Sequence, residues 1–338
     1  MSYELRMIPT FRFYVLFTAL LVMAACMSER ERAVDFYYWK TNVSLDETEQ
    51  KYFKNLDCRC LYIRFFDVDN DGSGIRPLAK VKPFDCEVLQ AEYVPVIFIT
   101  NRTFNGVSRQ EISDLAQRVF SLISEIAVVN KLPEINEIQI DCDWTSNTRN
   151  DFFRFLECLK EISNKKITCT LRLHQIAERQ KNGIPPVEKG YLMCYATSSP
   201  TDFSETNSIL DISLLKSYLK TANDYPVAFD VALPIYSWAV VKNHVGHIKL
   251  INNVTEAELQ AENRFQALPE KSYEATDNFF FRGIFMNKGF RIKVEGISPE
   301  LLQETKTFLN RHIHRDYRIV YYHLDRPFLE QYTVKQLK

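Results

Sequence analysis

Eight short apolar segments recur along this chain, and most of them are separated by segments with the pattern of an amphipathic helix. Alternating strands and helices are typical of a parallel sheet. Eight strands spread over about 300 residues favour one closed (β/α)8 TIM barrel. A doubly wound open sheet is the alternative, but glycine is scarce, with 9 residues, and no GxGxxG motif occurs. The predicted strands are residues 35–41, 59–67, 93–100, 137–143, 166–174, 190–196, 226–234 and 318–324.

The segments between the strands carry helix signals. Ser108 has Glu111 three positions after it, which is a capping box at the start of a long helix over 108–130. Residues 241–296 form an insertion after the seventh strand. We expect its FFFRGIFMNKGFRIKVEG stretch to contain a β-hairpin and to cap part of the barrel mouth. Further helices are predicted at 46–56, 147–162, 208–221 and 298–312.

The first residues differ in kind from the rest. Arg6 and Arg12 precede an uncharged apolar stretch that ends in VMAAC, and small residues before a cysteine resemble the bacterial lipobox. We therefore predict a lipoprotein signal peptide over 1–25, with Cys26 lipid-modified and 26–338 forming a single barrel domain. A plain secretion signal and an anchor helix are the alternatives. The expected location is the bacterial cell envelope, anchored by lipid on the periplasmic face or cell surface.

The charge and the cysteines exclude several classes of function. A net charge of −1 without a Lys/Arg-rich block gives no indication of nucleic-acid binding. No CxxC motif is present, and the single CxC at Cys58 and Cys60 has no companion, so we expect no metal site. No phosphate-binding glycine loop occurs, and we expect no cofactor.

Strand parity places polar residues inside the predicted barrel. In the fourth strand the apolar residues share one face, so Asp141 and Asp143 should point inward. The same parity directs Arg172 and His174 inward from the fifth strand and Asp230 from the seventh. Buried charges are costly unless paired, so structural pairing is the alternative for Asp141 and Asp230. Asp143 and His174 are near the ends of their strands, where active sites of such barrels lie.

The end of the second strand offers two more carboxylates. Residues 67–72 read DVDNDG, which matches the opening of an EF-hand calcium loop. Leu78 stands where that loop needs a glutamate, and a strand precedes it instead of a helix. We therefore prefer the interpretation that Asp67 and Asp69 face the site, with Arg64 as the charge within the strand.

The fourth strand ends in IQIDCDWT, which resembles the DxxDxDxE motif of glycoside hydrolase family 18, the chitinase-like barrels. In this alignment the first aspartate of the motif falls on Ile138 and its catalytic glutamate on Thr145. The sixth strand resembles the Met-x-Tyr pattern of that family at Met193 and Tyr195, with Ala196 in place of the aspartate that follows. The rest of the chain is similar to an uncharacterised group of bacterial TIM-barrel lipoproteins, through its RFFDVD and RLHQ segments.

The resemblance implies a glycan ligand and substrate-assisted hydrolysis with a glutamate as proton donor. A threonine at 145 cannot be that acid, so either another carboxylate works or the site only binds. Asp143 is the leading catalytic candidate, supported by Asp141 and Tyr195. Aromatic side chains at strand ends suit sugar rings. The predicted substrate-binding residues are Trp39, Arg64, Asp67, Asp69, Arg172, His174, Asp230, Tyr236 and Trp238.

These observations predict a lipid-anchored, glycoside-hydrolase-like barrel that acts on or binds an envelope or extracellular glycan. The alternative is a non-catalytic glycan-binding or structural envelope lipoprotein, because Thr145 replaces the catalytic glutamate. The expected partners are a glycan and, through the N-terminal lipid, a membrane.

Overall fold

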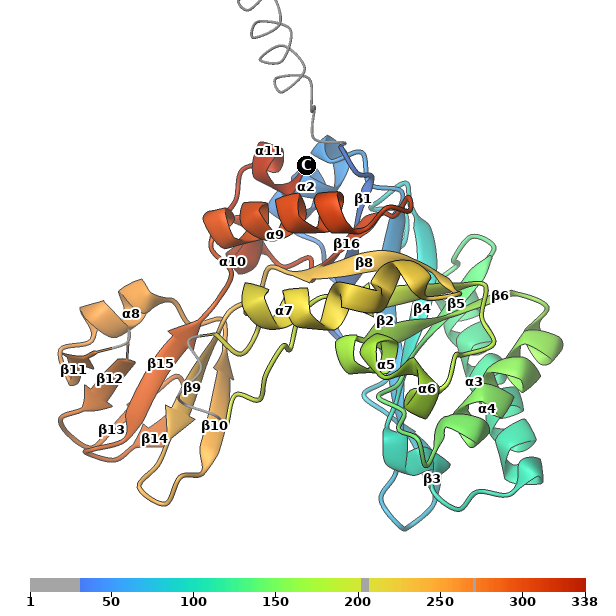
Figure 1. Ribbon diagram of the computed structural model, residues 1–338, viewed down its shortest axis with the longest axis horizontal. Coiled ribbons are helices and arrows are strands. Elements are labelled where there is room, and N and C mark those ends of the chain that lie inside the picture. Colours follow the sequence, from blue (N-terminus) through green and yellow to red (C-terminus); the bar gives the residue numbers. More distant parts are fainter. Residues whose placement is uncertain (1–30, 202–206, 270–271) are drawn as a thin grey trace, which may run out of the picture.

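Eight parallel strands close into a barrel in the computed structural model, which describes residues 31–201, 207–269 and 272–338 (Figure 1). The strand order is β1-β16-β8-β7-β6-β5-β4-β2, and pairing of β1 with β2 closes the ring. The chain is thus a (β/α)8 TIM barrel, as predicted. The barrel strands are β1 (Val34–Tyr38), β2 (Cys60–Asn70), β4 (Glu92–Ile99), β5 (Glu137–Asp141), β6 (Lys166–Arg172), β7 (Lys189–Met193), β8 (Ala228–Pro234) and β16 (Ile319–Tyr322).

Helices cover the outside of the barrel unevenly. The long α3 (Arg109–Val129) begins with the predicted capping box, since Ser108 accepts from the Glu111 amide and the Glu111 side chain accepts from the Ser108 amide. Between β2 and β4 the described chain has no helix and instead forms β3 (Ile75–Leu78), which pairs antiparallel with the end of β2. The other main helices are α2 (Glu47–Asn55), α4 (Arg149–Ser163), α7 (Ile212–Tyr218) followed by η2 (Leu219–Asp224), and α9 (Pro299–His312).

Short helices follow several strand ends. They are η1 (Asn101–Phe104), α5 (Leu173–Ala177), α6 (Arg179–Asn182), α10 (Arg326–Leu329) and α11 (Val334–Leu337). Within the described ranges, no helix combines the length and the apolarity needed to cross a bilayer. The predicted signal peptide and Cys26 lie outside the described residues, and lipid attachment stays a prediction.

The two faces of β5 separate as the parity predicted. Trp144, which follows the strand on the apolar face, is fully buried and stacks on Phe152 of α4 at 5.0 Å between ring centroids. On the opposite face, Gln139 accepts a hydrogen bond from the Tyr37 hydroxyl across the barrel interior at 2.8 Å. Period-two alternation puts these two sets of side chains on opposite sides of the strand, so a polar interior follows directly from the sequence.

The amino-terminal end of the barrel interior is filled by paired charges. Asp35 forms an ion pair with Arg318 and accepts hydrogen bonds from two backbone amides, those of Arg59 and Cys60. Asp230 forms an ion pair with Lys189 and accepts from the Arg318 amide at 2.9 Å. These contacts seal the end of the barrel opposite the strand ends where sites form.

The insertion folds as a sheet of its own beside the barrel (Figure 1). It begins at Trp238, slightly before the predicted boundary at 241, and buries a separate apolar cluster that includes Val241, Leu259 and Ile292. The predicted hairpin is present as β13 (Phe279–Phe281) and β14 (Ile284–Met286). The other elements are β9 (Trp238–Lys242), β10 (Ile248–Asn252), α8 (Glu256–Ala261), β11 (Phe265–Leu268), β12 (Ser272–Ala275) and β15 (Arg291–Glu295).

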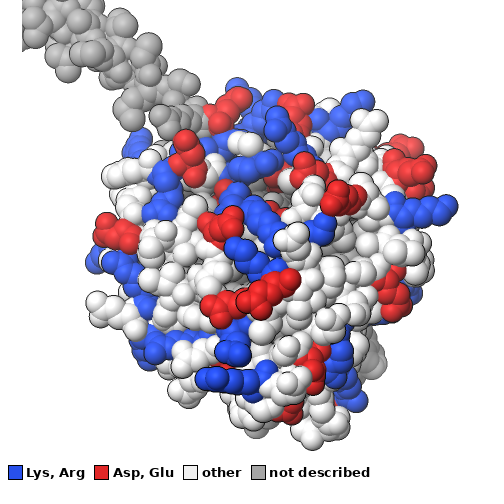
Figure 2. All heavy atoms as spheres, turned by 90° about the vertical axis from the view of Figure 1, so that its right-hand side faces the viewer, with Lys and Arg blue, Asp and Glu red and all other residues white. Residues whose placement is uncertain are grey.

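The surface charge is mixed. On the face shown in Figure 2, Lys and Arg side chains are interspersed with Asp and Glu side chains, with no broad area of one sign. This distribution agrees with the formal net charge of −1. Ion pairs between exposed side chains contribute little to the free energy of folding. The arrangement of the site therefore depends on the barrel and not on surface charge.

Candidate functional site

A cavity of about 620 Å³ opens at the carboxyl-terminal end of the barrel, where the sites of this fold lie. Each of the eight barrel strands contributes to its wall, either from the strand itself or from the residues that follow it. From the insertion, only Trp238, Asn252 and Asn253 line the cavity among the described residues, and we call these three residues its root. The expectation that the insertion caps the mouth therefore holds for the root alone. The lining residues are Trp39, Lys40, Arg64, Asp67, Phe98, Asp141, Arg172, Met193, Tyr195, Ala196, Tyr236, Ser237, Trp238, Asn252, Asn253, Tyr322, His323, Asp325 and Phe328.

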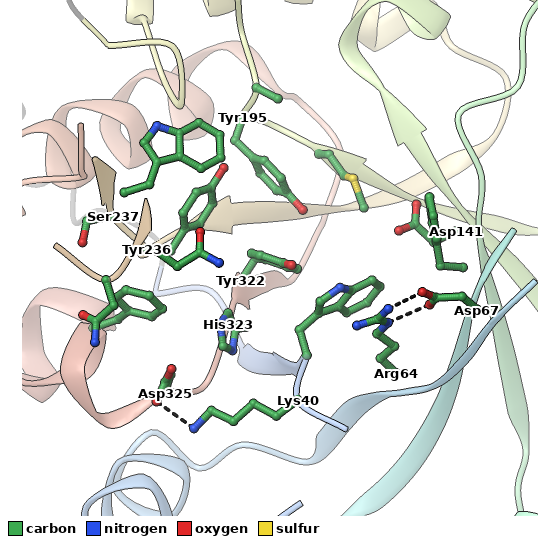
Figure 3. A pocket seen from close by; sticks show the side chains of 18 of the residues that line it. Lys40, Arg64, Asp67, Asp141, Tyr195, Tyr236, Ser237, Tyr322, His323 and Asp325 are labelled. Atoms are coloured by element: carbon green, nitrogen blue, oxygen red, sulfur yellow. Dashed lines mark hydrogen bonds and ion pairs between the residues drawn. The ribbon is translucent and has the colours of Figure 1, made fainter. Parts of the chain in front are cut away.

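Aromatic rings form much of the wall (Figure 3). Tyr322, at the end of β16, is in contact with Trp39 at 5.5 Å between ring centroids and with Tyr195 and Tyr236 at 5.6 Å each. Trp238 extends this group, since its ring lies 5.3 Å from that of Tyr236. Tilted and edge contacts of this kind are the favourable ones between rings, so the wall is a packed unit.

Asp141 is the buried carboxyl group of the cavity. It is 5% exposed and accepts a hydrogen bond from the Thr170 hydroxyl at 2.7 Å. Burial raises the pKa of Asp141 to about 6, and the positive charge of Arg172 only partly opposes that rise. A carboxyl group whose pKa is raised toward neutrality can donate a proton as a general acid more readily than an ordinary aspartate at the same pH.

The cations of the cavity are held by carboxylates. Arg64 donates through Nε and Nη2 to Asp67, and Figure 3 shows this pair next to Asp141. Arg172 donates in the same bidentate way to Asp143. Two parallel N–H···O bonds to one carboxylate fix the orientation of a guanidinium group. The Arg64 and Arg172 side chains are therefore held in place at the cavity.

Another ion pair lies at the opposite side of the cavity in Figure 3. Lys40 donates to Asp325 at 2.7 Å and to Glu49 at 3.1 Å. His323 lies near them, and burial lowers the pKa of its imidazole to about 4. The ring is therefore neutral at neutral pH and adds no charge to the cavity.

The sequence reasoning did not single out Lys40, Tyr322, His323 or Asp325. The signal that could have found Tyr322 was available, because YYHLD ends the eighth strand and one of its tyrosines must face inward. Lys40 and Asp325 are 285 positions apart in sequence, and no pattern along the chain relates them.

Several predicted site residues do line the cavity. Trp39, Arg64 and Asp67 come from β1 and β2 or the residues after them, and Asp141 and Arg172 come from β5 and β6. The predicted aromatic residues that follow β7 and β8 also line the cavity. Those aromatic residues are Tyr195, Tyr236 and Trp238.

Other predicted site residues lie outside the lining of this cavity. Asp143 is ion-paired with Arg172 and lies beyond the lining, although it was the leading catalytic candidate. Asp69 lies two residues further along β2 than Asp67 and accepts from Thr100 and Arg102, in the segment that follows β4. His174 is exposed on α5, and Asp230 lies near the start of its strand with Lys189. Parity predicts which face of a strand a side chain is on. Whether that side chain lines the cavity also depends on its position along the strand or in the following helix, which parity does not give.

The calcium alternative has no support in the structure. Asp67, Asp69 and Asp71 each form an ion pair with a different arginine, and the DVDNDG stretch is the start of the β2–β3 hairpin. Among the residues that the structure describes, no group of three or more His, Cys, Asp or Glu side chains could hold a metal ion.

Thr145 lies in the turn that leads into α4. Its carbonyl oxygen accepts from the Thr148 amide at 3.1 Å and the Arg149 amide at 2.9 Å, and its side chain is exposed outside the cavity lining. The position that carries the glutamate in the family 18 motif is therefore a helix-entry turn in this chain.

Comparisons with known proteins identify the fold. No protein-family model matches the chain, and no curated protein matches it by sequence. Among solved structures, the spore cortex-lytic enzyme SleL of Bacillus cereus is similar, with a TM-score of 0.55, 17% identity and coverage of 90% of this chain and 76% of that one. A chitinase from Chromobacterium violaceum has a TM-score of 0.55 and 13% identity, covering 91% of this chain and 99% of that one.

A third similar structure is the chitinase-like agglutinin of Robinia pseudoacacia, with a TM-score of 0.50, 8% identity and coverage of 91% and 98%. The chain thus has the chitinase-like barrel fold that the DxDW resemblance implied. The similarity to the bacterial lipoprotein group stays a prediction.

Proposed function

We propose that this chain is a lipid-anchored, glycoside-hydrolase-like barrel that takes an envelope or extracellular glycan into the mouth cavity and cleaves it. The observation that carries the proposal is Asp141, a buried carboxyl group with a raised pKa in a cavity walled by aromatic rings. Aromatic walls with a few polar groups are typical of sites for small organic ligands, and they suit the apolar faces of sugar rings. The similar structures named as a chitinase and a cortex-lytic enzyme support a glycan ligand.

Asp141 takes the place of Asp143 as the proton donor in this proposal. Glycosidic bond cleavage needs an acid that protonates the leaving oxygen and, in most families, a second carboxylate. Three carboxylates of the described residues line the cavity, and Asp67 is the candidate for this second role, because Arg64 orients it and its charge contributes to the raised pKa of Asp141. Asp143 is fully engaged by Arg172, which leaves it in a supporting role.

A glycan-binding barrel without catalysis is the second candidate, and Thr145 is the observation that favours it. A threonine hydroxyl is not an acid of suitable strength, so the chain lacks the acid of the family 18 motif at that position, and the side chain also lies outside the cavity lining. The structure from Robinia pseudoacacia supports this alternative, because it has a similar fold and is named as an agglutinin instead of a chitinase.

The test is a hydrolysis and binding screen of the purified protein against cell-surface glycans, with reducing ends and calorimetry as the readouts. We expect Asp141→Asn to lower kcat by about 10² to 10⁴ while neutral glycans still bind, because it removes the proton donor and leaves the aromatic wall in place. Asp57→Asn, at an exposed carboxylate, is the matched control and should keep full activity. Unchanged hydrolysis by Asp141→Asn would exclude Asp141 as the acid.

The alternatives give different results in the same screen. If the wild type cleaves no glycan but binds one, and Trp39→Ala weakens that binding, the protein is a glycan-binding barrel. Phe280→Ala, at an exposed ring on the β13 strand away from the cavity, is the control for Trp39→Ala. Absence of both binding and cleavage would favour a structural lipoprotein.

The lipid anchor is tested separately. We expect Cys26→Ser to move the protein from the membrane fraction to the soluble fraction, because the cysteine thiol is the predicted attachment point of the lipid. Retention of the Cys26→Ser variant in the membrane fraction would contradict lipid anchoring at this residue.

A further inference from the structure

The charges at the mouth cavity indicate the charge of its ligand. Lys40, Arg64 and Arg172 are its basic lining residues in the described chain, and each already has a carboxylate partner. Lys40 binds Asp325 and Glu49, while the two arginines use two N–H groups each on Asp67 and Asp143. An anionic ligand would therefore meet cations whose charge is already balanced by carboxylates.

Asp141 differs from the other carboxylates of the cavity. Its hydrogen bond comes from Thr170, a neutral donor, and no lysine, arginine or histidine of the described residues lies within ion-pair distance of it. Arg172 is close enough to influence Asp141, yet its Nε and Nη2 groups are directed at Asp143. In the described part of the chain, the three cations of the cavity have four carboxylate partners, and Asp141 is a fifth carboxylate. The formal charge of these eight groups is therefore −2 when Asp141 is ionised.

The aromatic wall adds to this preference. Ring faces attract cations within about 6 Å, and Tyr195, Tyr236 and Tyr322 present their rings to the cavity together with Asp141. Trp39 already has a cation over its ring, since the Arg64 guanidinium carbon lies 5.6 Å from the ring centroid. A carboxyl group without a cationic partner, in a cavity that is also lined by tyrosine rings, is a suitable environment for a ligand with ammonium groups.

We propose that this tyrosine-lined cavity recognises an amine-bearing saccharide, whose ammonium group pairs with Asp141, and that it rejects acidic saccharides. This inference rests on the proposed function, because it assumes a glycan ligand and names its charge. A neutral acetylated sugar would fill the same space but would leave Asp141 without a cation. An acidic sugar would add a like charge beside Asp67, Asp141 and Asp325.

The experiment compares three tetrasaccharides of equal length and β-1,4 linkage by calorimetry on the full chain at near-neutral pH. They are the oligomers of glucosamine, of N-acetylglucosamine and of glucuronic acid. We expect the glucosamine tetramer to bind about tenfold or more tightly than the acetylated one, and the uronic acid tetramer to bind most weakly. Asp141→Asn should abolish the preference for the amine, while Asp57→Asn should keep it.

A second measurement needs no variant. The preference of the wild type for the glucosamine tetramer should shrink as salt is added, because the discriminating contact is between charges. Equal affinity for the amine and the acetylated tetramer, or tightest binding of the uronic acid tetramer, would overturn the charge assignment and leave the proposed function standing. Binding of none of the three would overturn both.

Discussion

The two ends of the barrel interior hold the same kind of residue in different circumstances. At the amino-terminal end, Asp35 is fully buried and engaged by Arg318 and two backbone amides. At the carboxyl-terminal end, Asp141 is almost as buried but has only the Thr170 hydroxyl and a cavity in front of it. Burial raises the pKa of both carboxyl groups to about 6. A shifted pKa therefore does not identify the site here, and access to a cavity does.

The largest expected effect concerns the amino-terminal end. Asp35→Ala should lower the free energy of unfolding by about 3 to 5 kcal/mol, because it leaves two backbone amides without an acceptor and the partly buried Arg318 without its ion-pair partner. Urea denaturation measures the change. Asp141→Ala is the comparison and should cost clearly less, since Asp141 has one neutral donor. Equal losses would show that the two ends do not differ in pairing.

The pH dependence of stability gives the next largest expected effect, at Asp141. The pKa of Asp141 is raised from 3.8 to about 6, so the folded state binds its proton more tightly than the unfolded state does. The stabilisation from this group is therefore full below about pH 4 and is lost as the pH rises through 6, an effect of up to about 3 kcal/mol.

Asp141→Asn should remove that loss, so the difference in unfolding free energy between wild type and variant should shift in favour of the variant from pH 4 to 7. Asp35 contributes the same trend to both proteins and cancels in the difference. Urea denaturation at several pH values measures it, with Asp57→Asn as the control. A difference that does not change with pH would contradict the raised pKa of Asp141.

A third carboxylate tests whether pairing or position matters more. Glu295 lies at the mouth but is paired like Asp35, since it accepts from the Trp238 indole at 2.8 Å and forms a buried ion pair with Lys293 at 2.7 Å. Trp238→Phe should cost about 1 to 2 kcal/mol of unfolding free energy, because one acceptor site on Glu295 loses its donor.

The same variant should weaken glycan binding severalfold in calorimetry, because the indole that Glu295 orients is part of the cavity wall. Loss of stability with full glycan affinity would show that Glu295 only stabilises the root of the insertion. Phe280→Leu, at the exposed side chain in the middle of β13, should change neither quantity.

The smallest effect is expected at Thr145. Thr145→Glu restores the residue type of the family 18 motif, but the side chain is exposed outside the cavity, so hydrolysis should not increase. The unfolding free energy should also stay close to that of the wild type, as for most exposed positions. A gain of hydrolytic activity in the reducing-end assay would show that position 145 reaches the substrate after all.

Much of the fold followed from local patterns. The eight strand segments, the capping box at Ser108 and the hairpin at 279–286 are each set by residues close together in sequence, and the structure confirms them. The site was predictable in part, since Asp141, Arg172 and the strand-end aromatic residues were identified from parity and position. Asp143 and Asp230 show the limit, because parity says that a side chain faces inward but not at what depth, or beside which cation.

The sequence by itself determined that this protein forms a barrel with carboxylates inside it, because period-two alternation is a property of each strand alone. Only the tertiary structure decided which carboxylate is available for chemistry. Lys189, Arg318 and Arg172 come from other strands or strand ends than the acids they neutralise, and closing the barrel brings them together. Asp141 is left facing the cavity without such a partner, and that outcome depends on the three-dimensional arrangement of all eight strands.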